Sequence, residues 1–130
     1  MKKILIFGFH GLADDMTVYR LKEAFEKTGV EIVPVKKEDY LLSLGRLADM
    51  MPEKRMPDKK EQVYQGAELP VRMLLFAGFL QEELEQALEV CRQSGTTRED
   101  LKAVLTPFNY TWNAISLCEE LRKEHQQMRK

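Results

Sequence analysis

Two short apolar segments of the chain are nearly alike, and they constrain the fold more than any other feature. The first reads Ile4-Leu5-Ile6-Phe7-Gly8-Phe9 and the second reads Leu74-Leu75-Phe76-Ala77-Gly78-Phe79. Each precedes an amphipathic helical pattern that ends at a glycine, Gly29 or Gly95. A continuous apolar run that stops at glycine is typical of a strand buried on both faces of a parallel sheet. We therefore predict an α/β fold of two similar βαβα halves that arose by duplication.

The spacing of apolar residues predicts four strands and four helices. Strands are expected at residues 4–7, 30–35, within 71–79 and at 101–106. Helices are expected from Asp14 or Asp15 to Gly29, at 38–51, at 82–94 and from Trp112 or Asn113 to Met128. The predicted cap of the first helix is Asp14 or Asp15, and that of the last is Asn109 or Thr111. Gly45 is expected to weaken the helix at 38–51.

Residues 52–70 separate the two halves, because neither strand nor helix periodicity continues through them. Four residues punctuate this linker, namely Pro52, Pro57, Gly66 and Pro70. A short helix is expected within it, around Lys59 to Tyr64. We predict a single domain, residues 1–130, with a first half at 1–51 and a second half at 71–130.

The predicted sheet is small, mostly parallel and four-stranded, with helices packed on it. Right-handed crossovers make each half a parallel pair of strands. Pro34 lacks an N–H, so the strand at 30–35 is expected at an edge. Joining the halves through their first strands gives the order 2-1-3-4. Open sheets bind ligands beyond the carboxyl ends of their strands at a topological switch, which would lie between the two central strands.

The composition of the chain limits which classes of partner and which cellular compartment we expect. The net charge is −1, from 20 Lys and Arg against 21 Asp and Glu, so the basic excess typical of duplex nucleic-acid binding is missing. No segment approaches the roughly 18 apolar residues of a membrane span. The apolar start is interrupted by Gly8 and His10, so we read it as a buried strand and not as an export signal. Cys91 and Cys118 are expected to be reduced thiols, as in cytoplasmic proteins.

The loop after the first strand, Gly8-Phe9-His10-Gly11, is the first candidate site. Backbone N–H groups at the start of a helix can hold a phosphate or carboxylate, although a simple turn is the favoured explanation of the glycines. Neither G-x-G-x-x-G nor G-x-x-x-x-G-K-[ST] is present, and Asp14 and Asp15 would repel an anion. The ligand-binding candidates of this site are Gly8, Phe9, His10, Gly11, Gly78 and Phe79.

His10 is the acid–base candidate of that loop, because an imidazole titrates near neutral pH. Its expected partner is Asp14, Asp15 or the loop of the third strand. We assign no catalytic residue, metal site or cofactor from the sequence.

The segment Thr106 to Asn113 is the densest polar and aromatic cluster of the chain, and it follows the fourth strand. It has two interpretations. In the structural one, Pro107 stiffens the turn and Trp112 packs against the core. In the functional one, the segment is a recognition surface whose candidate residues are Thr106, Asn109, Tyr110 and Trp112.

The second half also contains a specific sequence pattern: Leu74-Leu75-Phe76-Ala77-Gly78-Phe79, Leu101-Lys102-Ala103-Val104-Leu105-Thr106-Pro107, then Asn109, Trp112 and Leu121-Arg122-Lys123-Glu124-His125. This pattern resembles the bacterial family catalogued as domain of unknown function 3783, over about residues 71–127. The family pattern has a small polar residue after the proline, where this chain has Phe108. The resemblance implies kinship and no mechanism, since the family has no established activity.

Together these features favour a small cytoplasmic binding or regulatory domain that is not an enzyme. Its partner would be a protein or a small molecule, and self-association would use an exposed sheet edge or the linker. The alternative is an anion- or nucleotide-binding enzyme that uses the loops after the first and third strands.

Overall fold

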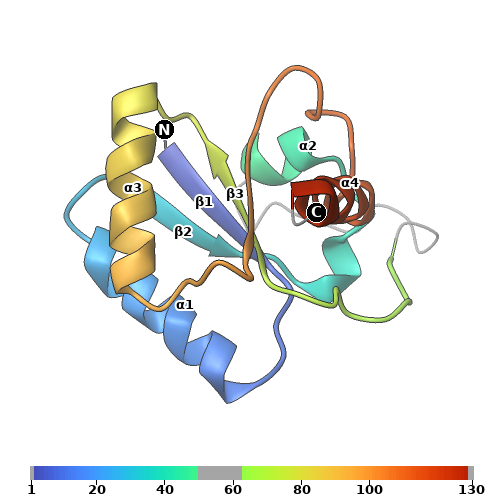
Figure 1. Ribbon diagram of the computed structural model, residues 1–130, viewed down its shortest axis with the longest axis horizontal. Helices are drawn as coiled ribbons and strands as arrows, with labels where there is room; N and C mark the ends of the chain where they lie inside the picture. Colours follow the sequence, from blue (N-terminus) through green and yellow to red (C-terminus); the bar gives the residue numbers. More distant parts are fainter. Residues whose placement is uncertain (1, 50–62, 129–130) are drawn as a thin grey trace.

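The computed structural model describes residues 2–49 and 63–128, and in these residues four strands form one sheet covered by helices on both faces (Figure 1). The strands are β1 (Lys2–Phe7), β2 (Val30–Pro34), β3 (Met73–Ala77) and β4 (Leu101–Val104). The helices are α1 (Leu12–Phe25), the 3-10 turn η1 (Lys37–Asp39), α2 (Leu44–Asp49), α3 (Gln81–Gln93) and α4 (Ala114–Met128). None of the described helices is long and apolar enough to cross a membrane.

The strand order is β2-β1-β3-β4, which confirms the predicted order and the α/β class. β1 and β2 are parallel, and so are β3 and β4. The two central strands β1 and β3 are antiparallel, so the sheet is mostly parallel with one antiparallel pair. As predicted, β2 is an edge strand. The neighbouring Val35 N–H bonds inward to Ile6 O (2.9 Å), so the nitrogen of Pro34 points away from the sheet, where no ladder bond is lost.

The pairing of residues follows the same rule in both halves. Lys2 pairs with Val30 and Met73 pairs with Leu101, 28 residues further along in each case. Leu5 lies opposite Leu75, 70 residues away, at the centre of the antiparallel pair. The two halves are therefore related by an approximate two-fold axis through that pair. We call positions 70 residues apart corresponding positions.

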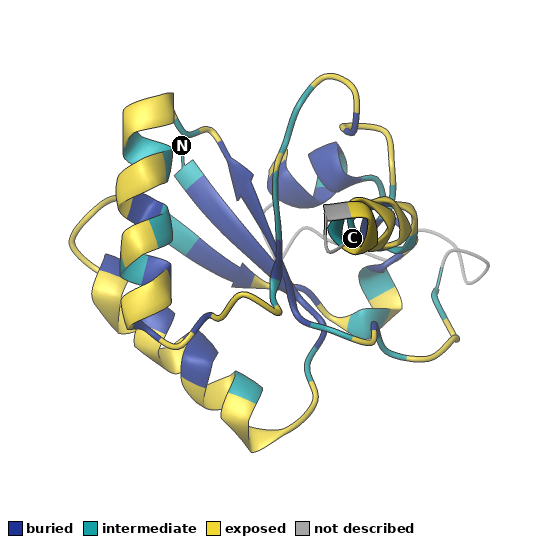
Figure 2. Cartoon of the chain, viewed as in Figure 1, coloured by how far each residue is buried: buried dark blue, intermediate teal, exposed yellow. Residues whose placement is uncertain are grey.

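The sheet separates two apolar cores, one on each face. α1 and α3 lie on one face and α2 and α4 on the other (Figure 1). Successive strand residues therefore belong to different cores: Ile4 and Ile6 face α1 and α3, whereas Leu5 and Phe7 face α2 and α4. All four are fully buried, which accounts for the continuous apolar run in the sequence, and the central strands β1 and β3 are mostly dark in Figure 2.

The two cysteines lie in different cores. Cys91 belongs to the core under α1 and α3, and Cys118 to the core under α2 and α4. The sheet lies between them, so they cannot form a disulfide with each other, and both are free thiols as expected.

The helix predicted for residues 38–51 is wrong within the described range. It is divided into η1 and α2, because the N–H groups of Leu44 and Gly45 bond to Trp112 O (2.8 Å) and Tyr110 O (2.9 Å). In a continuous helix Leu44 would bond to Tyr40 O, which instead accepts from Ala114 N–H (3.2 Å). Residues 50 and 51 lie outside the described residues, as does most of the helix expected around Lys59 to Tyr64.

Both predicted helix caps are also corrected. α1 begins at Leu12, so Asp14 and Asp15 lie within its first turn. α4 is capped by Asn113, whose Oδ1 accepts from Ser116 N–H (2.9 Å). Asn109 and Thr111 do not have this role.

Candidate functional site

The two glycine loops predicted to share one ligand site lie at opposite ends of the sheet. β1 and β3 are antiparallel, so their carboxyl ends, where Gly8 and Gly78 follow, face in opposite directions. Both glycines have a positive φ, 85° and 84°, as tight turns at corresponding positions require. A Cβ on Gly8 would also lie 2.4 Å from Val71 O. The geometry thus accounts for both glycines as turn residues and separates the two loops.

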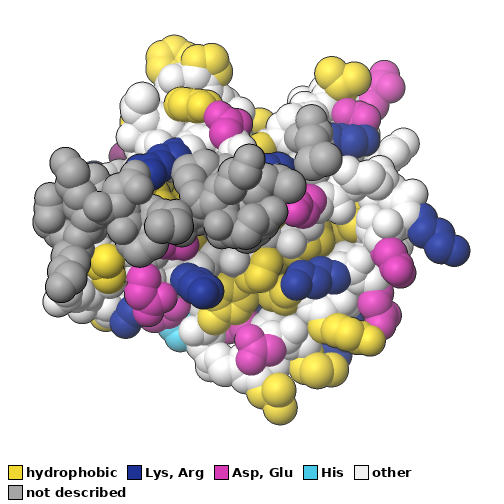
Figure 3. Space-filling view, turned by 180° about the vertical axis from the view of Figure 1, so that it is seen from behind, with side chains coloured by type: hydrophobic (Ala, Val, Ile, Leu, Met, Phe, Trp, Pro, Cys, Tyr) yellow, Lys and Arg dark blue, Asp and Glu magenta, His cyan; other side chains and the backbone are white. Residues whose placement is uncertain are grey.

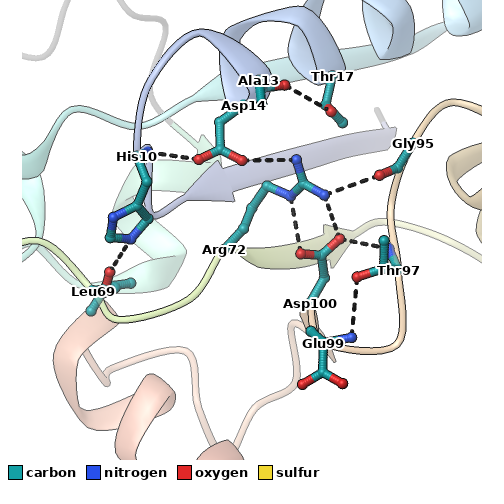
Figure 4. Close-up of polar contacts among 10 residues, drawn as sticks. All are labelled: His10, Ala13, Asp14, Thr17, Leu69, Arg72, Gly95, Thr97, Glu99 and Asp100. Carbon is teal, nitrogen blue, oxygen red and sulfur yellow. Dashed lines mark hydrogen bonds and ion pairs between the residues drawn. The ribbon is translucent and has the colours of Figure 1, made fainter.

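At the Gly8 end, the side chain of Arg72 is the centre of a polar cluster (Figure 4). Its Nε and Nη2 donate to both oxygens of Asp100, at 3.1 and 2.6 Å. Its Nη1 donates to Asp14 Oδ1 at 3.0 Å, and Nη2 also donates to Gly95 O at 3.2 Å. Arg72 and the Asp100 side chain are only 9% and 8% exposed. A bidentate pair with this burial holds the start of β3, the start of β4 and the start of α1 together.

His10 lies at the same end of the sheet and makes two hydrogen bonds there, one through its backbone N–H and one through its ring. Its N–H donates to Asp14 Oδ2 at 2.6 Å, and its ring Nε2 lies 2.5 Å from Leu69 O. A carbonyl only accepts, so Nε2 carries the proton in this arrangement. Asp14 contacts the backbone of His10 and not its ring. The expected acid–base pair of His10 with Asp14 is therefore not formed.

The charged groups of the Arg72 cluster pair with one another. One guanidinium faces two carboxylates, and Asp15 adds a further negative charge to the first turn of α1. Negative charges at this place stabilise the helix N-terminus and would repel an anion. Phe9 is half-buried against the core under α1, as is Phe79 at the far end. The Arg72 cluster therefore has a structural role, because it holds the starts of α1, β3 and β4 together.

The segment predicted as a recognition surface lies in the loop 105–113, which connects β4 to α4. Asn109 is buried, its Nδ2 donates to Val104 O (3.0 Å) and its Oδ1 accepts from Thr106 N–H (2.8 Å). The hydroxyl of Thr106 accepts from Asn109 N–H in return (3.3 Å). Asn109 and Thr106 therefore fold the loop, and the side-chain amide of Asn109 is occupied by these contacts.

Tyr110 and Trp112 fix the loop to α2. Their carbonyls accept the first N–H groups of that helix, as described above, and the hydroxyl of Tyr110 donates to Asp49. This hydrogen bond and the negative charge of Asp49 raise the pKa of Tyr110. The Tyr110 ring covers Gly45 so closely that a Cβ there would lie 2.2 Å from it. Both aromatic rings remain partly exposed, Tyr110 at 41% and Trp112 at 37%.

Phe108 is the residue that the sequence reasoning missed. It is 87% exposed, more than any other large apolar side chain among the described residues. Next to it lies an open hollow of about 490 Å³, lined by Leu105, Thr106, Pro107, Tyr110 and Thr111. Its position in the sequence could have indicated this exposure, because Phe108 directly follows the turn proline Pro107, where β4 no longer carries the chain into the core.

The described residues offer no reactive thiol and no metal centre. Burial raises the pKa of Cys91 to about 12 and also raises that of Cys118, so both thiols stay protonated at neutral pH. Within residues 2–49 and 63–128, no three His, Cys, Asp or Glu side chains are grouped to hold a metal ion.

These features define a small four-stranded α/β protein whose buried polar cluster is structural and whose most exposed large apolar side chain among the described residues, Phe108, lies on the loop 105–113. Residues 72–128 match the model of a family described as a domain of unknown function, DUF3783. The match confirms the resemblance expected for residues 71–127 and covers β3, α3, β4 and α4. Comparison with curated proteins and with solved structures found no match.

Proposed function

We propose that this protein is a small, non-enzymatic binding domain that recognises a protein partner through the loop 105–113. The observation that carries the proposal is the 87% exposure of Phe108 on a loop that hydrogen bonds of the buried Asn109 hold in place. Aromatic side chains supply most hot spots of protein interfaces. A preformed loop also loses little conformational entropy on binding, which leaves more of the contact energy for affinity.

The neighbours of Phe108 support the same proposal. Val104, Tyr110 and Trp112 are each at least 36% exposed, so the apolar surface extends from the end of β4 to the start of α4. Exposed apolar area of this kind on a folded domain is a common sign of a protein contact. On the face seen in Figure 3, basic and acidic side chains are interspersed, with apolar groups among them.

The proposal also includes a compartment and an origin. A bacterial cytoplasm suits a protein with two free, buried thiols. Duplication of one βαβα unit suits the equal pairing offsets of the two halves. A match of the family model to residues 2–49 would support duplication, whereas a distinct family for that half would contradict it.

The experiment uses a photo-reactive amino acid at position 108 and, as a matched control, at position 12. Leu12 is 76% exposed and lies at the other end of the sheet, on α1. A partner cross-linked from position 108 and not from position 12 is then purified, and its affinity is measured by calorimetry. Phe108→Ala is expected to weaken binding about tenfold or more. Leu12→Ala is expected to leave the affinity unchanged, and equal effects of the two substitutions would contradict the proposal.

A further inference from the structure

The two halves differ in how their first helix covers the edge strand. α1 packs against β2, whereas α3 makes few contacts with β4. A hollow of about 540 Å³ opens along α3, and it is lined by that helix, by residues 96–98 and by Lys102 of β4. Leu88 of α3 contributes apolar surface to it. We call this hollow the α3–β4 groove.

The groove exists because two filling side chains are missing. In the first half, Phe25 and Ile32 are buried in the core under α1, where they fill the space between α1 and β2. The corresponding positions in the second half are Gly95, which has no side chain, and Lys102, whose charged end cannot remain in an apolar core. The chain therefore closes one helix–strand gap and leaves the other open.

The outer edge of β4 has hydrogen-bonding groups that the outer edge of β2 lacks. Leu101 and Leu105 donate inward, to Arg72 O and Phe76 O, both at 2.9 Å. Because a strand alternates, the N–H groups of Lys102 and Val104 point outward, and no strand of the described sheet pairs there. Val104 corresponds to Pro34, which has no N–H to offer. The β4 edge can accept an added strand, and the β2 edge resists one.

The charges in the groove select an acidic occupant. Arg98 forms no ion pair with a described residue, and Lys102 Nζ donates a hydrogen bond to Thr97 O at 3.0 Å but pairs with no carboxylate of the described residues. Of the other charged lining groups, Arg92 is paired with Glu89, and Glu85 lies further along α3. The end of the groove next to Lys102 is therefore net positive.

A buried hydroxyl in the groove also lacks a partner. Thr96 is only 4% exposed, and its Oγ1 has no hydrogen-bond partner in the part of the chain that the structure describes. Buried hydroxyls are normally hydrogen-bonded. Thr96 lines the groove, so this unpaired hydroxyl belongs to the wall of the groove.

We propose that the α3–β4 groove binds an extended segment of a protein partner, which pairs with β4 as a fifth strand and places acidic side chains next to Lys102 and Arg98. This inference rests on the proposed function in that the partner is a protein, and it adds a second contact beside the loop 105–113. A second copy of this chain is a poorer occupant. Two-fold pairing of β4 with itself would bring the positive ends of both grooves together, and like charges across strands are destabilising.

The probe is an N-acetylated, fluorescent heptapeptide of alternating valine and glutamate, and its matched control alternates valine and lysine. Binding is measured by fluorescence anisotropy on the full chain. The glutamate peptide is expected to bind about tenfold more tightly than the lysine peptide, because its carboxylates face Lys102 and Arg98. Amide hydrogen exchange is expected to slow at Lys102 and Val104 and to stay unchanged at Ile32, on the opposite edge.

Two substitutions test the edge and the charge separately. Val104→Pro gives β4 the blocked edge that β2 has naturally, without removing an inward ladder bond, and is expected to weaken peptide binding about tenfold. Lys102→Glu is expected to reverse the preference between the two peptides, and it carries the test if Val104→Pro does not fold. Phe108→Ala lies outside the groove and is expected to bind the glutamate peptide like the unchanged protein.

Three results would overturn the inference: equal binding of the two peptides, full binding by Val104→Pro, or a dimer of the free protein that Val104→Pro dissociates in sedimentation. The two proposals fail differently. If a partner requires Phe108 but still binds Val104→Pro, the proposed function holds and the groove proposal is wrong. If the glutamate peptide binds in the groove but no partner cross-links to position 108, the groove proposal holds and the loop proposal is wrong.

Discussion

The two halves of the molecule share their topology and differ in what their equivalent positions contain. Both have a strand, a helix on the same face of the sheet, and a second strand paired at the same offset. The first half fills its helix–strand gap with Phe25 and Ile32, while the second leaves a groove with Gly95 and Lys102. The backbone arrangement therefore tolerates either a closed or an open edge, and the side chains decide which edge can bind.

The ion pairs at the two ends of the sheet extend this comparison. Lys2 and Arg72 correspond, and each pairs with a carboxylate in the first turn of the other half's helix: Lys2 with Glu83 at 2.7 Å and Arg72 with Asp14 at 3.0 Å. Only Arg72 has a second carboxylate, Asp100, and only its end is buried. The pair at the Lys2 end is about one-third exposed on both sides.

The largest expected effect separates these two ends. Arg72→Met leaves two poorly exposed carboxylates without their cation and is expected to lower the free energy of unfolding by about 3–5 kcal/mol. The matched substitution Lys2→Met removes an exposed pair and is expected to change it far less. Urea denaturation of both variants measures the difference. Equal destabilisation would show that the two ends are held alike, against the geometry.

A second comparison concerns the tyrosines that precede α2 and α4. Tyr40 and Tyr110 correspond, but Tyr40 is fully buried and Tyr110 is 41% exposed. The hydroxyl of Tyr40 accepts from Gly8 N–H (2.8 Å) and donates to Glu68 (2.5 Å), so it joins the first half to the residues before β3. Burial, together with the bond to Glu68, raises the pKa of Tyr40 well above its usual range. Tyr110 instead covers Gly45, whose corresponding residue is Ile115.

Gly45→Ala tests that contact. The new Cβ would overlap the Tyr110 ring, so we expect the free energy of unfolding to fall by about 1–3 kcal/mol, although alanine favours helices. In Tyr110→Ala, where the ring is absent, the same substitution is expected to be neutral or stabilising. A double-mutant cycle in urea gives the coupling. If Gly45→Ala stabilises both backgrounds, the ring does not hold the loop on α2.

Much of the fold follows from local sequence signals. Buried apolar runs predict the strands, and Pro34 predicts the position of β2 at the edge. The antiparallel direction of β1 and β3 could not be predicted in the same way. Both strands are buried on both faces, so their sequences have no alternation that distinguishes one direction or face from the other. The break in the helix expected at 38–51 likewise depends on carbonyls of residues 110 and 112, far along the chain.

The candidate site was harder to predict for a related reason. Arg72 precedes an ordinary apolar strand, and its partners Asp14 and Asp100 lie 58 and 28 residues away. Only the folded sheet shows that they meet. The aromatic loop was visible as a cluster, but no local signal separates the buried Asn109 from the exposed Phe108, because both follow the same proline turn. Exposure depends on the contact with α2.

The smallest expected effect concerns Cys91. It corresponds to Leu21, and both residues are fully buried on the same face of the sheet, but only Cys91 has an ionisable side chain. Burial raises the pKa of Cys91 from 9.0 to about 12. The unfolded chain therefore loses this proton first, so the stability due to the neutral thiol is complete below pH 9 and is lost as the pH rises toward 12. We expect the unchanged protein to lose about 1.4 kcal/mol more than Cys91→Ala between pH 7 and pH 10, measured by urea denaturation. Parallel pH profiles would contradict this prediction, because they would mean that folding does not raise the pKa of the Cys91 thiol.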